Sequence, residues 1–412
     1  MRQVFLKYER GIISVRYVNP MKIAIICDVL GEENNGTTIA AMNLIRSLKA
    51  KGHSVRVVCP DEKYSSVPGF YVVPQRSFGP FDGYLEKNGV TLAKPDADII
   101  RSAIKGADVA HIMLPFSVGK AAIRIAKEEG VPVTAGFHFQ AENLTAHLKL
   151  QHFDLLNDAV YHSRWNAFYK YVDCIHYPTQ FIRDVFEKSV GQKTEGRVIS
   201  NGVAKAFTEN GAAREKRVGG KFTVICTGRY SREKRQELLI EAATLSKYKD
   251  DIKLVFAGDG PLKDKLIRLA EEKKVDAEFK FFSREELLGA LRSADLYVHT
   301  AEIEIEAIAC LEAIASGLVP VIANSPRSAT RYYALDEKNL FDYDSPSSLA
   351  ERMDFWRENP AEAEKNRAAY ADFTREIDYD ACMDKMEAML KEVAENAKER
   401  AKTEAEAAGG EV

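Results

Sequence analysis

Two cationic side chains stand close together in a segment that is suited to hold a phosphate. Arg229 and Lys234 lie in the run GRYSREK, 228–234, between an apolar stretch and a helical pattern. An Arg and a Lys at the end of a strand, beside a helix N-terminus, make a site for a diphosphate. Gly228 lets the backbone approach such a ligand. The alternative is a solvated basic turn capped by Ser231, since charge runs are usually surface faces.

Two glutamates further along the chain have a spacing that suits one elongated ligand. Glu304 and Glu312 are eight positions apart in the alanine-rich run 301–317. If this run is one helix, steps of about 100° leave the two carboxylates roughly 80° apart and about two turns along, so both can face one ligand. Glutamates are also common on amphipathic helices without any function. We expect Glu302 and Glu306 to be surface charges.

Three further turns carry residues that can bind or react. Gly258 and Gly260 lie in an AGDGP turn, which is also the composition of a plain turn. His138 follows an apolar run at 131–135, although a lone His is more often structural. Gly36 belongs to a polar loop whose backbone N–H groups can face a phosphate. That loop lacks GxGxxG, which disfavours a dinucleotide site.

All of these residues depend on strands and helices that alternate twice along the chain. Short apolar runs predict buried parallel strands at 22–27, 54–58, 109–113, 131–135, 174–177 and 198–203, and again at 222–227, 253–257, 278–282, 296–299 and 319–323. Helical patterns such as 39–51 and 237–247 lie between them. The fold class is therefore α/β, with two doubly wound sheets whose ligands bind at the carboxyl ends of the strands.

The same patterns divide the chain into segments. We predict an N-terminal extension at 1–20, a first α/β domain at 21–203, a polar linker at 204–220, a second α/β domain at 221–378, a charged C-terminal helix at 379–400 and a disordered low-complexity tail at 401–412. A short ordered arm is the alternative for the first segment.

Composition argues against several classes of protein. The net charge of -3 provides no basic field for nucleic acid. The six cysteines are scattered and form no CxxC pair, which favours a reduced cytoplasmic compartment and disfavours structural zinc. No apolar run reaches the length of about 18 residues that a membrane-spanning helix needs. The first twenty residues also lack the pattern of a secretory signal.

Together, these segments resemble the retaining glycosyltransferases of family 4, which have the GT-B fold of two Rossmann-like domains facing a central cleft. The resemblance runs from Met21 to about Lys391. It is carried by GRYSREK, the AGDGP turn, the E-x7-E pair and the NGV at 201–203. It implies that the domain at 221–378 binds a nucleotide-sugar donor and that the domain at 21–203 binds the acceptor.

The resemblance also implies roles for single residues. Arg229 and Lys234 are expected to hold the donor diphosphate and to stabilise its charge as it departs. Glu312 is expected on the nucleotide ribose and Glu304 beside the donor sugar, with His138 lining the sugar site. The implied catalytic residues are therefore His138, Glu304, Arg229 and Lys234, and the implied donor-binding residues are Gly36, Gly228, Arg229, Lys234, Gly258, Gly260, Glu304 and Glu312.

One departure from the family concerns the donor loop. Family members usually have glycines where this chain has Ile305 and Ala307, so the donor-sugar pocket must differ. The lost glycines keep open a non-catalytic paralogue that binds sugar nucleotides. A nucleotide-sugar epimerase of the same fold is a second alternative, and the paired cationic and glutamate patterns disfavour it.

The reaction implied by the resemblance is transfer of a sugar with retention at the anomeric carbon. The co-substrate is expected to be a UDP-sugar, and no metal cofactor is expected. Three Asp-x-Asp pairs occur, but all lie outside the donor segments, at Asp96 and Asp98, Asp342 and Asp344, and Asp378 and Asp380.

The acceptor is expected to be a lipid or a glycan. The segment HFQAEN at 138–143 is similar to one in enzymes that glycosylate diacylglycerol. Aromatic and basic residues mix over 137–171, as at a membrane surface, so peripheral contact with the inner membrane face is an expectation. The alternative is that these aromatic side chains belong to the core.

Overall fold

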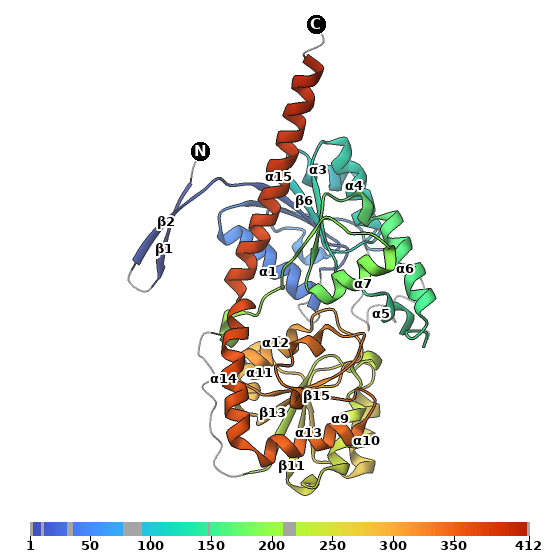
Figure 1. Cartoon of the computed structure of the whole chain (residues 1–412). Helices are drawn as coiled ribbons and strands as arrows, with labels where there is room; N and C mark the ends of the chain where they lie inside the picture. The colour runs from blue at the N-terminus through green and yellow to red at the C-terminus, as the bar shows by residue number, and fades with distance from the viewer. Residues whose placement is uncertain are drawn as a thin grey trace. The chain divides into compact units, whose positions relative to one another are not determined.

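The chain folds into two α/β units (Figure 1). The computed structural model describes residues 3–9, 12–30, 36–76, 93–146, 149–208 and 220–409. One unit comprises Met1–Phe139, Asp158–Ile199 and Met383–Val412, and the other comprises Gln140–Asn157 and Ser200–Cys382. Both units are built on parallel sheets, so the predicted fold class is confirmed.

The first unit has a parallel sheet that runs, within the described residues, in the order β5-β4-β3-β6-β7-β8-β9. Its strands are β3 (Lys22–Ile26), β4 (Ser54–Cys59), β5 (Phe70–Val72), β6 (Val109–Ile112), β7 (Val133–Gly136), β8 (Cys174–Tyr177) and β9 (Gly196–Val198). The helices along this part of the chain are α1 (Gly36–Ala50), α3 (Ala97–Ile104), α4 (Ser117–Glu128), α6 (Asp154–Ala167) and α7 (Gln180–Val190). The inner strands β6, β7 and β8 are buried along their whole length, as parallel strands covered on both faces must be.

The second unit has a parallel sheet in the order β12-β11-β10-β13-β14-β15. Its strands are β10 (Phe222–Thr227), β11 (Ile252–Ala257), β12 (Ala277–Lys280), β13 (Leu296–His299), β14 (Pro320–Ala323) and β15 (Leu340–Phe341). The helices of this unit include α5 (Ala141–Ala146), α8 (Lys205–Thr208), α9 (Glu237–Leu245), α10 (Lys263–Lys273), α11 (Arg284–Ser293), α12 (Ile308–Ala315), α13 (Pro346–Glu358) and α14 (Pro360–Glu376).

Alternate residues of β10 face opposite sides of this second sheet. Val224 and Cys226 belong to the apolar cluster that includes side chains of α9, α10 and α13. Ile225 belongs to the cluster that includes side chains of α11, α12 and α14. Because successive residues of a strand point to opposite faces, an uninterrupted apolar run supplies both cores at once.

Local sequence signals set several helix ends. The side-chain hydroxyl of Thr179 accepts a hydrogen bond from the backbone N–H of Ile182 at the start of α7, and the helix ends at Gly191 with a φ of 73°. Ser283 and Glu286 form a reciprocal capping box at the start of α11. These caps satisfy backbone groups that the helix itself leaves without partners.

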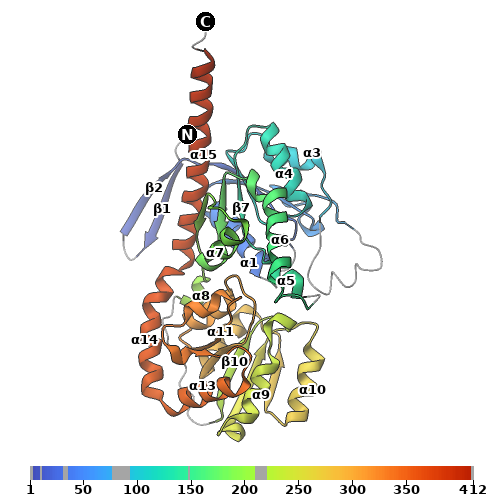
Figure 2. The ribbon, with the colours of Figure 1, turned by 45° about the vertical axis from the view of Figure 1, so that its right-hand side comes forward.

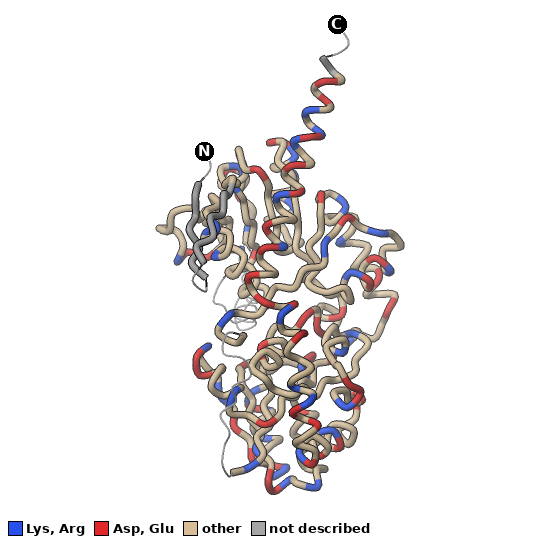
Figure 3. The backbone as a smooth tube through the Cα atoms, turned by 60° about the vertical axis from the view of Figure 1, so that its left-hand side comes forward, with Lys and Arg blue, Asp and Glu red and all other residues tan. Residues whose placement is uncertain are grey.

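The C-terminal helix α15 (Tyr379–Gly409) is longer than predicted. A disordered tail was expected from 401, whereas the helix continues to Gly409, and its last turns project from the first unit (Figures 1 and 2). This prediction was wrong because the Ala, Glu and Lys residues that make the tail low in complexity are also strong helix formers. Figure 3 shows Lys and Arg interspersed with Asp and Glu along this helix.

Side chains of α15 anchor it to the first unit. Met386 and Leu390 are buried. At its outer part, the Lys398 ammonium lies 2.7 Å from a carboxylate oxygen of Asp108, and the Arg400 guanidinium lies 2.8 Å from Asp173. The helix that follows the second domain in sequence therefore belongs mostly to the first unit.

Other predicted boundaries also differ from the structure. The stretch Gln140–Asn157 belongs to the second unit, although the sequence placed it within the first domain. The predicted linker at 204–220 begins with helix α8, and its residues 209–219 lie outside the described part of the chain. Within the predicted extension at 1–20, β1 (Gln3–Glu9) pairs antiparallel with β2 (Ile12–Val18).

Candidate active site

Two backbone turns pack against each other at the carboxyl ends of β10 and β11. The backbone N–H of Tyr230 donates to the carbonyl oxygen of Asp259 at 2.9 Å. A Cβ added to Gly258 would lie 2.0 Å from the carbonyl oxygen of Gly228, and one added to Gly260 would lie 2.5 Å from that of Tyr230. Both glycines therefore have a structural reason to be present, because any larger residue would separate the turns.

Lys234 ends a short helix, η4 (Arg232–Lys234), and its ammonium forms an ion pair with Glu304. The hydroxyl of Thr300 donates to the carbonyl oxygen of Lys234 at 2.7 Å. Burial by itself lowers the pKa of Lys234, but the carboxylates of Glu304 and Glu233 together outweigh burial and raise it. Burial raises the pKa of Glu304, but Lys234 and His299 bring it down to about 2. Both partners are therefore charged at neutral pH.

Two buried hydrogen bonds and one ion-pair contact lead from the sheet to Glu304. The hydroxyls of Thr227 and Tyr297 are 3.1 Å apart, and the Tyr297 hydroxyl is 3.0 Å from Nδ1 of His299. Nε2 of His299 lies 3.2 Å from Oε1 of Glu304. Sequence reasoning missed this series of contacts. The available signal was a run of polar side chains at the carboxyl end of β13, where ligands of such sheets bind.

Glu304 does not lie on a helix, so the argument from helical phase was wrong. Its backbone forms a bridge with Ser328, and its carbonyl oxygen accepts from the N–H of Ala329 at 2.9 Å. Helix α12 begins only at Ile308, after Ala307, which has a φ of 61°. A left-handed residue at this point separates the extended loop from the helix, and an alanine takes that conformation at a cost.

The other glutamates of this run are also buried. Glu312 lies on α12, and its Oε1 is 2.7 Å from Nη1 of Arg284. Burial raises the pKa of Glu312, and Arg284 offsets part of that effect. Glu302 is 5% exposed and Glu306 is 4% exposed, so the prediction that these two are surface charges was wrong.

Arg229 is partly exposed on the same turn as Gly228. Its carbonyl oxygen accepts from Nε2 of Gln236 at 2.8 Å. Arg229 and Lys234 therefore lie on the loop after β10, and the ion pair joins Lys234 to Glu304 on the loop after β13. Glu312 is held separately, by Arg284.

His138 belongs to the first unit and follows β7. Its ring lies edge-on to that of His176, with the centroids 5.7 Å apart. A Cβ on Gly136 would come within 2.7 Å of the His138 ring, so the glycine leaves room for the imidazole. Burial, together with His176, lowers the pKa of His138 to about 3, which keeps the ring neutral near pH 7.

Gly36 is the first residue of α1, and a Cβ added there would meet no atom within 4 Å. Residues 31–35 of the preceding loop lie outside the described residues, so the phosphate contact expected for this loop stays a prediction.

Half of the aromatic residues that suggested a membrane surface are in the core. Phe137, Tyr161, Phe168 and Tyr169 are each exposed by 1% or less, and Phe137 lies 4.8 Å from Tyr169 between ring centroids. The core alternative is right for these four. The aromatic side chains of Phe153 and Tyr171 are exposed, and so are the aliphatic side chains of Leu144, Leu150 and Leu155.

The described residues lack two further features. They contain no group of three or more His, Cys, Asp or Glu side chains arranged to hold a metal ion. They also contain no helix with the length and apolar character needed to cross a membrane.

The two parallel-sheet units and the family models that the chain matches identify the class of protein as a GT-B glycosyltransferase. The first part of the chain matches the model of "Glycosyltransferase Family 4" over residues 34–207. The second part matches "Glycosyl transferases group 1" over residues 208–374. The chain belongs to the family-4 glycosyltransferases, and it is a transferase enzyme.

Individual relatives agree with this family. The alpha-monoglucosyldiacylglycerol synthase of Streptococcus pneumoniae is 24% identical over 318 residues, which cover 74% of this chain and 71% of the relative. A GDP-mannose-dependent alpha-mannosyltransferase of Corynebacterium glutamicum is 27% identical over 74% of this chain and 72% of its own. Anabaena HepE, solved with UDP-glucose, has a TM-score of 0.68 at 14% identity and covers 90% of this chain and 99% of its own, which supports the fold.

Proposed function

We propose that this enzyme transfers a sugar from a UDP-sugar to a lipid acceptor, with retention at the anomeric carbon. The observation that carries the proposal is the Lys234–Glu304 ion pair beyond the end of β10. The carboxylates of Glu304 and Glu233 raise the pKa of Lys234, so its ammonium group is positively charged and can stabilise an anionic leaving group. Arg229, on the preceding turn, supplies the second cation.

In the proposed reaction, the bond between the anomeric carbon and the diphosphate oxygen breaks as positive charge develops on the sugar ring. The bonding electrons leave with the diphosphate, whose growing charge Arg229 and Lys234 stabilise. The acceptor hydroxyl attacks from the face that the diphosphate leaves, and its proton passes to a phosphate oxygen. The carboxylate of Glu304 lies beside Lys234 and faces the electron-poor sugar. No step in this scheme requires a metal ion.

We propose that His138 lines the sugar site as a neutral imidazole. Its lowered pKa supports this, because a neutral ring can accept a hydrogen bond from a sugar hydroxyl without placing a cation beside the developing oxocarbenium ion. Substitution of His138 by Ala should therefore weaken turnover more than it weakens UDP binding.

Two observations support the lipid acceptor. The relative from Streptococcus pneumoniae is, by its name, a synthase of alpha-monoglucosyldiacylglycerol, which is a glycolipid. The exposed apolar side chains Leu144, Leu150, Phe153 and Leu155 fall within a stretch of the second unit that also reaches the donor loops, since Nε2 of Gln140 donates to the carbonyl oxygen of Arg327 at 2.8 Å. Exposed apolar side chains beside a polar site suit an acceptor with one apolar part, and they favour peripheral contact with a membrane.

The test offers the purified protein UDP-glucose, UDP-galactose and GDP-mannose, each with diacylglycerol in mixed micelles. Release of UDP together with an α-linked glycolipid, seen by NMR of the anomeric proton, would support the proposal. Turnover of GDP-mannose alone would refute the UDP assignment, and a β-linked product would refute retention. If no donor is consumed or hydrolysed while UDP still binds, the non-catalytic alternative is right.

A further inference from the structure

Glu306 is a buried carboxylate that the proposed reaction does not use. Its side chain reaches the segment Ser200–Val203, where the chain enters the second unit. Oε1 accepts from the Ser200 hydroxyl at 2.6 Å and from the backbone N–H of Asn201 at 2.9 Å. Oε2 accepts from the side-chain amide of Asn201. One carboxylate therefore joins two segments more than a hundred positions apart in sequence.

The negative charge of the Glu306 carboxylate is stabilised by hydrogen-bond donors that are themselves neutral. Among the described residues, every partner recorded for the Glu306 carboxylate is an O–H or N–H group of Ser200 or Asn201. Burial raises the pKa of Glu306, and those hydrogen bonds act against it. Removing a donor from a buried charge is expensive, so the geometry around Glu306 is strongly constrained.

Glu306 also belongs to the loop that presents Glu304. It lies two residues after Glu304 and directly before Ala307, the left-handed residue at the start of α12. Its own carbonyl oxygen accepts from the hydroxyl of Tyr333 at 2.6 Å. Both its side chain and its backbone are therefore fixed, and a loop pinned at this point has little freedom to move Glu304 away from Lys234.

The segment held by Glu306 is itself anchored. The backbone N–H of Val203 donates to the carbonyl oxygen of Ile377 at 2.9 Å. A Cβ on Gly202 would lie 3.1 Å from Cα of Tyr379, so the segment runs close against the start of α15. The support that Glu306 uses is therefore held in place by the two residues that directly follow Asn201.

We propose that Glu306 is a positioning residue for the transfer reaction, which locks the donor loop to the Ser200–Val203 segment and so aligns Glu304. This inference rests on the proposed function, because it assumes that Glu304 faces the donor sugar. The carboxylate of Glu306 accepts a hydrogen bond from the amide of Asn201. If the two residues exchange these groups, so that an amide stands at 306 and a carboxylate at 201, we expect the contact to be preserved.

The test compares Glu306→Gln with the double variant Glu306→Gln, Asn201→Asp. In the single variant, the NH2 group of Gln at 306 faces the NH2 group of Asn201, so the hydrogen bond from Asn201 loses its acceptor. In the double variant, the Gln amide donates to the new carboxylate while its carbonyl oxygen still accepts from Ser200 and from the backbone N–H at position 201. We expect kcat to fall about tenfold or more in the single variant and to recover to within about threefold of wild type in the double variant, at a temperature where both are folded.

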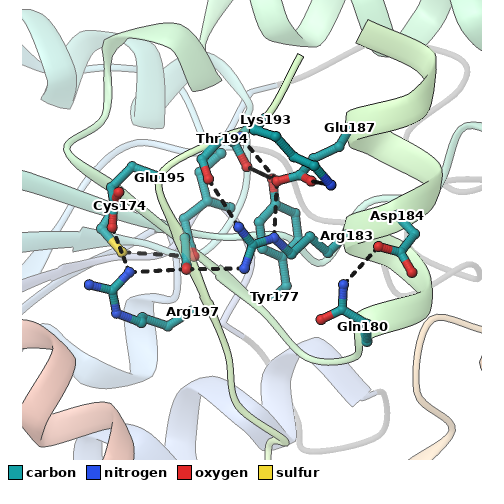
Figure 4. Close-up of polar contacts among 12 residues, drawn as sticks. Cys174, Tyr177, Gln180, Arg183, Asp184, Glu187, Lys193, Thr194, Glu195 and Arg197 are labelled. Carbon is teal, nitrogen blue, oxygen red and sulfur yellow. Dashed lines mark hydrogen bonds and ion pairs between the residues drawn. The ribbon is translucent and has the colours of Figure 1, made fainter. Parts of the chain in front are cut away.

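A matched control is Glu187→Gln in the first unit (Figure 4). Glu187 is also a buried carboxylate, which accepts from the backbone N–H of Thr194 at 3.0 Å and pairs with Arg183 and Lys193. Its loss should lower the melting temperature and leave kcat unchanged. Hydrogen exchange over residues 302–307 gives a readout without turnover, and Glu306→Gln should speed exchange there whereas Glu187→Gln should not.

Wild-type kcat and unchanged exchange in Glu306→Gln would overturn the inference, as would a double variant that recovers its melting temperature but not its kcat. If the single variant does not fold, Ser200→Ala removes one bond to the same oxygen, and an unchanged kcat there would also overturn it. If the wild-type enzyme turns over no donor, the proposed function fails, while the exchange measurement still tests the lock.

Discussion

Replacing Lys234 by Met should separate the stabilising role of its ion pair from its role in catalysis. Met keeps most of the side-chain length and removes the charge, so Glu304 is left as a buried carboxylate facing an apolar group. Nε2 of His299 remains 3.2 Å from Oε1 of Glu304, and among the ion pairs of the described residues it is then the only partner of this carboxylate. Breaking one side of a buried pair is costly because the remaining charge is no longer compensated.

The expected loss of folding stability can be worked out from the pKa of Glu304. The pKa of Glu304 is about 2 in the folded protein, against an ordinary value of 4.5. This difference corresponds to about 3 kcal/mol of folding stability at pH 7. Because the folded pKa is the lower one, the stabilisation is present above about pH 4.5 and is lost as the pH falls towards 2. His299 shares in lowering this pKa and remains in the variant, so Lys234→Met should lose up to about 3 kcal/mol at pH 7 and little at the acid end.

The assay measures urea unfolding and donor turnover of Lys234→Met, Glu304→Gln and the double variant. The double variant has no buried charge at this position, so its stability at pH 7 should exceed that of Lys234→Met. Its turnover should stay about a hundredfold or more below wild type, since the leaving diphosphate has lost a cation.

Two results would refute this reasoning. If Lys234→Met unfolds at the same urea concentration as wild type at pH 7, the ion pair contributes nothing to the fold. If the double variant recovers turnover together with stability, Lys234 serves only to neutralise Glu304 and does not act on the donor.

Three further outcomes are expected. Ala307→Gly should stabilise the protein by about 1 kcal/mol in urea unfolding, because glycine takes a φ of 61° without a Cβ penalty; a loss of stability would show that the alanine methyl group packs usefully. Gly258→Ala should destabilise by about 1–3 kcal/mol and raise the KM for the donor, because its Cβ would meet the Gly228 carbonyl; wild-type values would contradict the close packing of the two turns. Treatment with EDTA should leave turnover unchanged, and a tenfold loss reversed by Mn²⁺ or Mg²⁺ would contradict the metal-free scheme.

Much of the architecture could be predicted from sequence because buried parallel strands are apolar on both faces. β10 and β13 lie where the pattern placed them, at 222–227 and 296–299. β5 and β15 were not predicted, since edge strands of two or three residues carry too little pattern to separate them from loops. The last strand of the first sheet, β9, ends at Val198, where the apolar run 198–203 had predicted a strand to begin.

The candidate site was predicted in part. The sequence selected Arg229 and Lys234 because an Arg and a Lys after a strand suit an anionic ligand, and their contact with a donor stays a prediction. The chain from Thr227 through Tyr297 to His299 was missed, because each of its members is unremarkable in sequence and only the sheet places β10 beside β13. A helix drawn through Glu304 was wrong because backbone pairing with Ser328 competes with helix formation there.

By itself, the sequence determined the alternation of strands and helices, the two sheets and the cationic turn after β10, because local periodicity and residue type are sufficient for these features. The tertiary structure alone decided that Gln140–Asn157 joins the second unit, that α15 belongs mostly to the first, and that Glu302 and Glu306 are buried. These outcomes depend on contacts between residues far apart in the chain, and no local pattern encodes which distant donor will meet a carboxylate.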